Sequence, residues 1–223
     1  MMVTGVDVVG LSKRVPVPTS SCSTALPRAT SIVSRPWLAE FSVAFSTTYY
    51  PPPDLARLGT ADLCDVFHPQ EVGQHSDLKI ADSIFRNYGG KTRFSGKIAT
   101  VHCYENNPLV RKALEAPGED HVLVVDGGGS LRCALLGDNL AEHAAKNGWQ
   151  GIILNACIRD SEEISKMAVG VKALNTHPLK SAKGNPGVQD VPVTFAGVTF
   201  IPGQYVYADS DGIVVSEKDL GSN

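Results

Sequence analysis

The chain has 223 residues, enough to bury one substantial core but few for two full domains. Its composition, 43% apolar and 19% charged, is typical of soluble globular proteins. A net charge of −3 offers no electrostatic basis for binding nucleic acid, which usually needs a basic patch. The longest apolar runs have strand length, far short of the roughly 18 residues of a membrane-spanning helix. We therefore expect neither a nucleic-acid partner nor a membrane partner.

The chain has five cysteines at wide spacings, with no C-x-x-C pair. Such a set argues against both a disulfide framework and a zinc site. It is typical of a reducing compartment, where cysteine mainly fills the core as a small side chain. We expect these thiols to be unpaired.

Residues 1–50 differ from the rest of the chain. They are rich in Ser, Thr, Pro and Val, with four basic residues and only Asp7 and Glu40 as acids. This composition is typical of a transit peptide, and the alternative is a disordered extension without a targeting role. We divide the chain into an N-terminal extension, residues 1–53, and one folded domain, residues 54–223. The expected location is the cytoplasm, or a plastid or mitochondrion if the extension is a transit peptide.

The first elements of the folded domain alternate between helix and strand. A helix is predicted at residues 60–67, with Thr60 placed to cap its first turn. Alternating apolar and polar residues predict a half-buried strand at 97–105. The next helix, 108–116, starts with a proline, which a first helical turn accepts.

The middle of the chain has buried strands that alternate with helices. The apolar run "HVLVVD" predicts a buried strand that ends at a Gly-rich turn. A helix follows at 139–147, closed by Gly148, and a second buried strand at 151–157. A short helix is expected after Asp160. The last part, 191–217, is strand-rich with several glycine turn signals, so we predict a single α/β domain.

The stretch "GDNLAEHAAKNGWQGIILNACIRD" begins with a Gly-Asp pair and ends with an Arg-Asp pair. Asp138 and Asp160 each precede a predicted helix, where a capping carboxylate contributes about 1 kcal/mol. Glu163 follows Asp160 at the spacing of a capping box. Capping does not explain Arg159, because a cation is unfavourable near a helix N-terminus.

A binding site is the other interpretation of these charges, and it is compatible with capping. Both acids follow buried strands or Gly-rich turns, and ligands of open α/β sheets gather at the carboxyl ends of strands. Arg159 offers a planar fork that binds a carboxylate through two hydrogen bonds. Asp160 offers a hard oxygen ligand suited to Mg²⁺ or Mn²⁺. Together they predict a site for a small acidic molecule held on a divalent cation.

Other motifs carry less information. The Gly-rich turn at 127–129 matches neither the dinucleotide nor the P-loop pattern, so close backbone approach is the favoured explanation. His177 has no partner at metal-ligand spacing and is expected to be structural. Lys180 and Lys183 could in principle form a Schiff base, but solvated surface positions are the favoured interpretation.

Sequence blocks along the folded domain resemble a known family. The blocks are "VLVVDGGGSLRCALLGDNLAEHAAKNGWQGIILNACIRD", "GVKAL", "HPLK", "FAGVTF" and "YADSDGIVVSE". They are similar to the regulator of ribonuclease activity A family, especially its plant-type 4-hydroxy-4-methyl-2-oxoglutarate aldolases. The resemblance covers about residues 58–220. It implies a β/β/α swivelling-domain sandwich, assembled as a ring-shaped homotrimer with active sites between subunits.

The resemblance also implies roles for individual residues. Aldolases of the family carry the pattern D-x₂₀-R-D-x₂-E/D, which is complete here in Asp138, Arg159, Asp160 and Glu163. The implied substrate contacts are Gly137, Asp138, Asn139, Leu140 and Arg159. Asp138 and Arg159 are the implied catalytic residues, and Asp160 holds the divalent cation. Glu163 either supports the water ligands of that cation or acts only as a cap.

The function implied by the resemblance is a class II, metal-dependent aldolase. It would cleave 4-hydroxy-4-methyl-2-oxoglutarate to pyruvate through an enolate and decarboxylate oxaloacetate through the same enolate. The alternative is a non-catalytic regulator that binds a ribonuclease or RNA helicase partner. The intact Arg159–Asp160 pair favours the enzyme, because the bacterial regulators lack the acid after the arginine.

Overall fold

The structure is a computed structural model of the chain, and it describes residues 59–68, 76–184 and 187–221. The expected extension, residues 1–53, and the expected domain start at Asp54 lie outside these described residues. No helix in the described part of the chain is long and apolar enough to cross a membrane.

All four helices seen in the described residues coincide with predicted ones. They are α1 (Thr60–Phe67), α2 (Pro108–Glu115), α3 (Asp138–Lys146) and α4 (Ser161–Ile164). Helix α3 buries Leu140, Ala141 and Ala144, the spacing of a single apolar face. Gly148 ends this helix with a φ of +83°, a conformation that favours glycine, as predicted.

Ten strands form one mixed sheet in the order β1-β12-β11-β3-β4-β6-β7-β2, with β5 paired to β6 and β8 to β3. These strands are β1 (Leu78–Ile80), β2 (Arg86–Asn87), β3 (Phe94–His102), β4 (His121–Asp126), β5 (Ala134–Leu136), β6 (Gly151–Ile158), β7 (Gly170–Thr176), β8 (Val188–Gln189), β11 (Tyr205–Ala208) and β12 (Ile213–Ser216). Strands β3, β4, β6 and β7 run parallel, and β5 runs parallel to β6.

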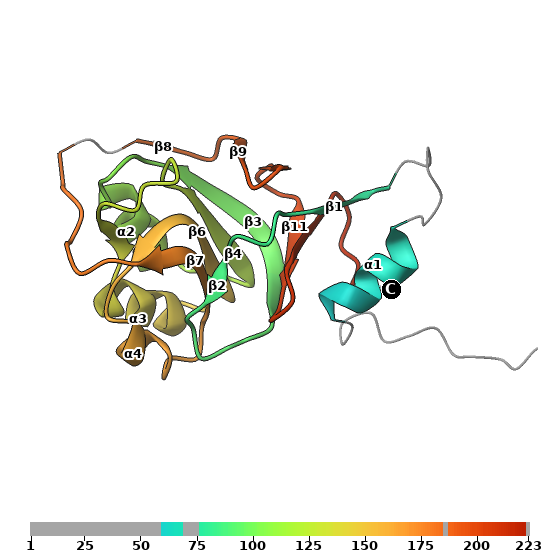
Figure 1. The fold of residues 1–223 in the computed structure, drawn as a ribbon, viewed down its shortest axis with the longest axis horizontal. Coiled ribbons are helices and arrows are strands. Elements are labelled where there is room, and N and C mark those ends of the chain that lie inside the picture. The colour runs from blue at the N-terminus through green and yellow to red at the C-terminus, as the bar shows by residue number, and fades with distance from the viewer. Residues whose placement is uncertain (1–58, 69–75, 185–186, 222–223) are drawn as a thin grey trace, which may run out of the picture. The chain divides into compact units, whose positions relative to one another are not determined.

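Apolar residues alternate between the two faces of the central strands. In β4, Leu123 and Val125 pack in one core with α2 and α3, whereas Val122 and Val124 belong to a second core. Figure 1 shows α2, α3 and α4 together on one side of β4, β6 and β7. The uninterrupted apolar run of β4 is therefore buried on both faces, as predicted.

A hairpin of β9 (Val193–Phe195) and β10 (Val198–Phe200) packs in the second core. The rings of Phe195 and Phe200 stack there with centroids 4.6 Å apart. The hairpin turns at Ala196 and Gly197, both with positive φ, in agreement with the predicted turn. Helices, central sheet and hairpin form the expected β/β/α sandwich, and the α/β class is confirmed.

Five strands, β1, β2, β5, β7 and β8, were not predicted from the sequence. Strand β7 contains Lys172, which is only 2% exposed and interrupts the apolar pattern. Burial lowers the pKa of the Lys172 ammonium, while the carboxylates of Asp209 and Asp211 oppose this effect. The other four strands have two or three residues each, too few to show a periodicity.

The predicted Thr60 cap of α1 is wrong, because the N-cap is Gly59. The backbone N–H and the hydroxyl of Thr60 both donate to the carboxylate of Asp209, each at 2.7 Å. The same carboxylate accepts the backbone N–H groups of Asp211 and Gly212 at 3.0 and 3.3 Å. An acid 149 residues away therefore satisfies the helix end, and no local pattern can reveal such a contact.

The two remaining expectations about local structure are confirmed. All four cysteines of the described residues, Cys64, Cys103, Cys133 and Cys157, are free thiols. In the Gly-rich turn, a Cβ on Gly127 would lie 2.7 Å from the Cβ of Ala156, so the backbone approaches its neighbour as closely as expected.

Candidate active site

Three neighbouring parallel strands end at one edge of the sheet. Strand β5 pairs with β6 and β6 with β7, so the residues after their last positions lie side by side. The backbone N–H of Arg159 donates to Leu136 O at 2.9 Å. The N–H of His177 donates to Ile158 O at 2.8 Å. The charged pairs at the two ends of the conspicuous stretch thus meet at the carboxyl edge of the strands.

Arg159 and Asp160 form an ion pair beside the first turn of α3. Nε of Arg159 lies 3.2 Å from Oδ2 of Asp160, and their side chains are 37% and 34% exposed. The same Oδ2 accepts a long hydrogen bond from the backbone N–H of Asp138 at 3.4 Å. Asp160 has a left-handed φ of 56°, a costly conformation for a non-glycine residue that concentrates at functional sites. The pair is held in place yet open to a ligand.

Capping does not explain the acids of this site. The N-cap of α3 is Gly137, and Asp138 only accepts from the backbone and side-chain N–H groups of its neighbour Asn139, at 2.6 and 2.9 Å. Asp160 occupies the N-cap position of α4, but its carboxylate makes no capping hydrogen bond to α4 in the described structure and instead accepts from the first N–H of α3. Glu163 is exposed on the first turn of α4. The capping-box interpretation is therefore wrong here.

Gly137 allows the ion pair to lie against the start of α3. A Cβ at this position would be 2.8 Å from Oδ2 of Asp160 and 3.1 Å from Nε of Arg159. Real Cβ atoms essentially never approach an oxygen at the first of these distances. A side chain at this position would therefore displace the charged pair.

A cavity of about 240 Å³ opens at this edge of the sheet. Its lining residues are Asn107, Arg111, Ala134, Leu136, Gly137, Asp138, Asn139, Leu140, Arg159, Lys180, Ser181 and Lys183. The five expected substrate contacts all belong to this lining. The side chain of Leu140 is only 3% exposed and packs in the core. At this position α3 therefore faces the cavity mainly with its backbone.

A second hollow, of about 280 Å³, shares Arg159 and is lined on its other side by Asp160 and His177. Nδ1 of His177 accepts the backbone N–H of Leu179 at 3.1 Å, which supports the expected structural role. Its place beside Asp160 was not expected, since no sequence spacing links the two residues.

The residues that line the first cavity from α2 and from the segment after β7 were not predicted to share a site. Asn107 and Arg111 come from the N-terminal turns of α2, and Ser181 from the segment after β7. Lys180 and Lys183 are exposed, as expected, but they also line the cavity. Only the block "HPLK" pointed to this segment, and nothing in the sequence linked it to α2.

The donor set at Asp160 fits a hard divalent cation that keeps several water ligands. Its Oδ2 is shared by Arg159 and the Asp138 N–H, whereas the described residues give Oδ1 no partner. No group of three His, Cys, Asp or Glu side chains comes together in the described residues. One accessible carboxylate is instead typical of Mg²⁺ bound beside an anionic substrate.

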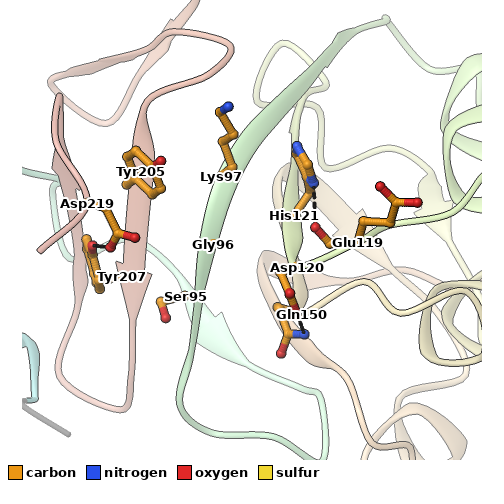
Figure 2. Close-up of a pocket in the computed structure, with 10 residues that line it drawn as sticks. All are labelled: Ser95, Gly96, Lys97, Glu119, Asp120, His121, Gln150, Tyr205, Tyr207 and Asp219. Carbon is orange, nitrogen blue, oxygen red and sulfur yellow. Dashed lines mark hydrogen bonds between the residues drawn. The ribbon is translucent and has the colours of Figure 1, made fainter. Parts of the chain in front are cut away.

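A larger cavity, of about 480 Å³, lies at the amino end of β4. Figure 2 shows Tyr205 and Tyr207 of β11 on one side of β3, with His121 and Gln150 on the other. Nδ1 of His121 lies 2.9 Å from two carbonyl oxygens and therefore carries the proton. Because ligands of α/β sheets gather at carboxyl rather than amino strand ends, we place the candidate active site at the smaller cavity.

The fold and the site define a class of protein: a β/β/α sandwich with an Arg–Asp pair at the carboxyl edge of its parallel strands. The RraA-like family, described as Aldolase/RraA, matches residues 60–215. The chain belongs to this family.

Two bacterial relatives carry the name "Putative 4-hydroxy-4-methyl-2-oxoglutarate aldolase". The protein of Aromatoleum aromaticum is 55% identical over 161 residues, which cover 72% of this chain and 97% of the relative. The protein of Alkalilimnicola ehrlichii is 53% identical over 161 residues, covering 72% of this chain and 96% of the relative.

Two solved structures share the fold under other names. A Geobacillus kaustophilus protein described as an S-adenosylmethionine:2-dimethylmenaquinone methyltransferase has a TM-score of 0.68 at 51% identity, covering 74% of this chain and 99% of that one. The RNA-processing inhibitor RraA of Thermus thermophilis has a TM-score of 0.66 at 41% identity, covering 72% and 93%. These names describe different activities, so function must be argued from the site.

Proposed function

We propose that this chain is a metal-dependent aldolase that cleaves 4-hydroxy-4-methyl-2-oxoglutarate into two molecules of pyruvate and decarboxylates oxaloacetate at the same site. The observation that carries the proposal is the partly exposed Arg159–Asp160 pair at the start of α3, beside a largely cationic cavity. The names of the relatives above 50% identity support the aldol cleavage.

Arg159 and the first turn of α3 bind the 2-oxo acid end of the substrate in this proposal. The guanidinium donates to the carboxylate and to the 2-oxo oxygen, for which its planar fork is suited. The positive end of the α3 dipole faces the same anion. Both groups stabilise the negative charge that grows on the 2-oxo oxygen as the reaction proceeds.

Asp160 would hold the divalent cation, Mg²⁺ or Mn²⁺, through a carboxylate oxygen. A cation bound there supplies a Lewis acid next to the 2-oxo oxygen. Glu163, exposed on the first turn of α4, would hydrogen-bond water near Asp160 rather than ligate directly.

Asp138 takes the proton from the C4 hydroxyl, directly or through one water. The C3–C4 bond then breaks, its electron pair moves onto C3 and the 2-oxo group, and C4 becomes the ketone of the first pyruvate. Protonation of the enolate at C3 gives the second pyruvate. In oxaloacetate the same enolate forms when C4 leaves as carbon dioxide.

The test is pyruvate release from both substrates, measured with Mg²⁺, with EDTA, and with the variants Arg159→Ala and Asp160→Asn. We expect activity that needs metal and falls by about 10²-fold or more in each variant, because both act on the developing charge. Turnover no faster than free Mg²⁺ alone would contradict the proposal. A circular dichroism spectrum like that of the wild-type chain would show that a variant has not lost its activity by unfolding.

The similarity to an RNA-processing inhibitor supports a second candidate, a protein-binding regulator of a ribonuclease complex. Capture of a ribonuclease or RNA helicase that is unaffected by Asp160→Asn, together with absent turnover, would favour it. A Schiff-base aldolase is the less suitable chemistry, since a reactive lysine is typically desolvated whereas Lys180 and Lys183 are exposed. Trapping by borohydride with pyruvate would reveal such a lysine.

A further inference from the structure

The candidate active site holds more positive charge than one carboxylate requires. Its cationic lining residues are Arg111, Arg159, Lys180 and Lys183. Among the described residues, Asp138 is the only acid in the lining. Arg159 already faces Asp160, and Arg111 lies 3.4 Å from Glu115 on the exposed side of α2. Among the described residues no carboxylate pairs with either lysine, so their charge is available to a ligand.

Arg159 and the two lysines come from chain segments on opposite edges of β5. Ala134 of β5 pairs with Cys157 of β6 on one edge and bridges to Lys180 on the other. The bridge is made by hydrogen bonds from the Ala134 N–H to Leu179 O at 2.8 Å and from the Ser181 N–H to Ala134 O at 3.1 Å. Two strand spacings, about 10 Å in all, therefore separate the backbone of β6, which Arg159 follows directly, from that of the lysine segment.

The region of the lysine segment also contains polar atoms without partners. Ser181 is 6% exposed and lines the cavity, yet its Oγ has no hydrogen bond. Asn106, 2% exposed and bridged to Ala182, has an unpaired Oδ1. Two of the three such atoms found in the described residues lie in this region. Because an unpaired buried hydroxyl costs about 1–3 kcal/mol, the arrangement points to a ligand that accepts from Ser181.

We propose that Arg111, Lys180, Lys183 and the Ser181 hydroxyl form a second anion subsite that binds the C5 carboxylate of a five-carbon diacid. The inference rests on the proposed function, in which Arg159 and α3 bind the 2-oxo acid end. The carboxyl carbons of an extended five-carbon diacid lie about 5 Å apart. A hydrogen bond of about 2.8 Å at each end brings the span close to 10 Å. This matches the distance between the backbones of β6 and the lysine segment, which lie on the two edges of β5. The chain therefore selects diacids over monoacids.

A binding experiment tests the subsite without requiring catalysis. Titration calorimetry with Mg²⁺ present compares 2-oxoglutarate with 2-oxopentanoate, which differ in the distal carboxylate. We expect the wild-type chain to bind the diacid about tenfold or more tightly, and the double variant Lys180→Met, Lys183→Met to lose this preference. Equal affinity for the two acids, or a preference that persists in the double variant, would overturn the inference.

Kinetics provide the second readout. The substrates are 4-hydroxy-4-methyl-2-oxoglutarate and its monoacid analogue 4-hydroxy-4-methyl-2-oxopentanoate, which carries a methyl group in place of the C5 carboxylate. We expect the double variant to lower kcat/KM for the diacid about tenfold or more, mainly by raising KM. Ser181→Ala should lower the same kcat/KM by a smaller factor. The kcat/KM for the monoacid and the rate at which pyruvate exchanges its C3 protons should each change less than twofold. Equal losses on both substrates would mean that the lysines act elsewhere.

Matched controls separate the two proposals. Lys112→Met removes an exposed cation next to Arg111 that does not line the cavity, and it should leave both preferences unchanged. A wild-type chain that prefers the diacid in calorimetry but releases no pyruvate would overturn the proposed aldolase while supporting the subsite. A wild-type chain that cleaves both substrates equally well would support the proposed aldolase and overturn the subsite.

Discussion

Gly137 shows how much of the site depends on one missing side chain. Its backbone has the extended dihedral angles that any residue adopts, so conformational freedom is not the reason for glycine here. The reason is the contact with the Arg159–Asp160 pair, which lies where a Cβ would be.

We expect Gly137→Ala to lower kcat/KM for aldol cleavage by about 10²-fold, because the new methyl group displaces the charged pair from its catalytic position. The fold should persist, since the clash involves exposed side-chain ends. Pyruvate release and the unfolding temperature measure the two effects. Gly212→Ala is the control, because a Cβ there meets no atom within 4 Å. Unchanged activity in Gly137→Ala would show that the pair can shift freely.

At the scale of elements, helix N-termini meet carboxylates from distant parts of the chain. Helix α3 directs its first N–H toward Asp160, and α1 receives Asp209 from the end of β11. Burial by itself would raise the pKa of Asp209, but hydrogen bonds from Thr60, Asp211 and Gly212 outweigh it and lower that pKa below 3.8. The ionised carboxylate is therefore the form that holds α1.

We expect Asp209→Ala to destabilise the domain by about 2–3 kcal/mol, because it leaves the first turn of α1 without its charged acceptor. Amide hydrogen exchange in α1 should rise well before that in β4. The lowered pKa fixes the pH dependence: the contribution is complete above pH 3.8 and disappears as the pH falls through the lower folded-state value. Wild-type exchange in α1 should approach that of the variant only in this acidic range. Asp211→Ala, which keeps the backbone donor, is the control.

For the whole molecule, the relatives indicate how much chain the fold needs. A match of 161 residues covers 96–97% of two relatives, so these proteins have little that corresponds to the first part of this chain. The family match likewise runs from residue 60 to residue 215.

We expect residues 54–223 to fold alone and to keep the kcat/KM of the full chain within about twofold, because the matched region holds both cores and the site. Light scattering should give the mass of three copies, the assembly implied by the family resemblance. A truncated protein that aggregates or loses activity would show that residues before Asp54 contribute to the folded domain. A monomer of full activity would contradict the trimer alone.

Local patterns predicted the elements whose reasons are local. Pro108 begins α2, Gly148 closes α3, and the apolar run of β4 is buried on both faces, as the sequence indicates. The Arg159–Asp160 pair was predicted from its place after a buried strand and from the family pattern. By contrast, β7 was not predicted, because Lys172 interrupts its apolar pattern. Lys172 is buried by its neighbours on β2 and β6, although a lysine side chain is usually exposed.

The sequence by itself determined the α/β class, the helices, the buried central strands and the charged pair, because each follows from a period, a cap signal or a motif within a short segment. Only the tertiary structure decided which groups share the cavity. Pairing of β5 with β6 on one edge and with the Lys180 segment on the other brings Arg159 and the two lysines to one cavity. Strand pairing joins residues far apart in the chain, and no local interaction fixes which strands become neighbours.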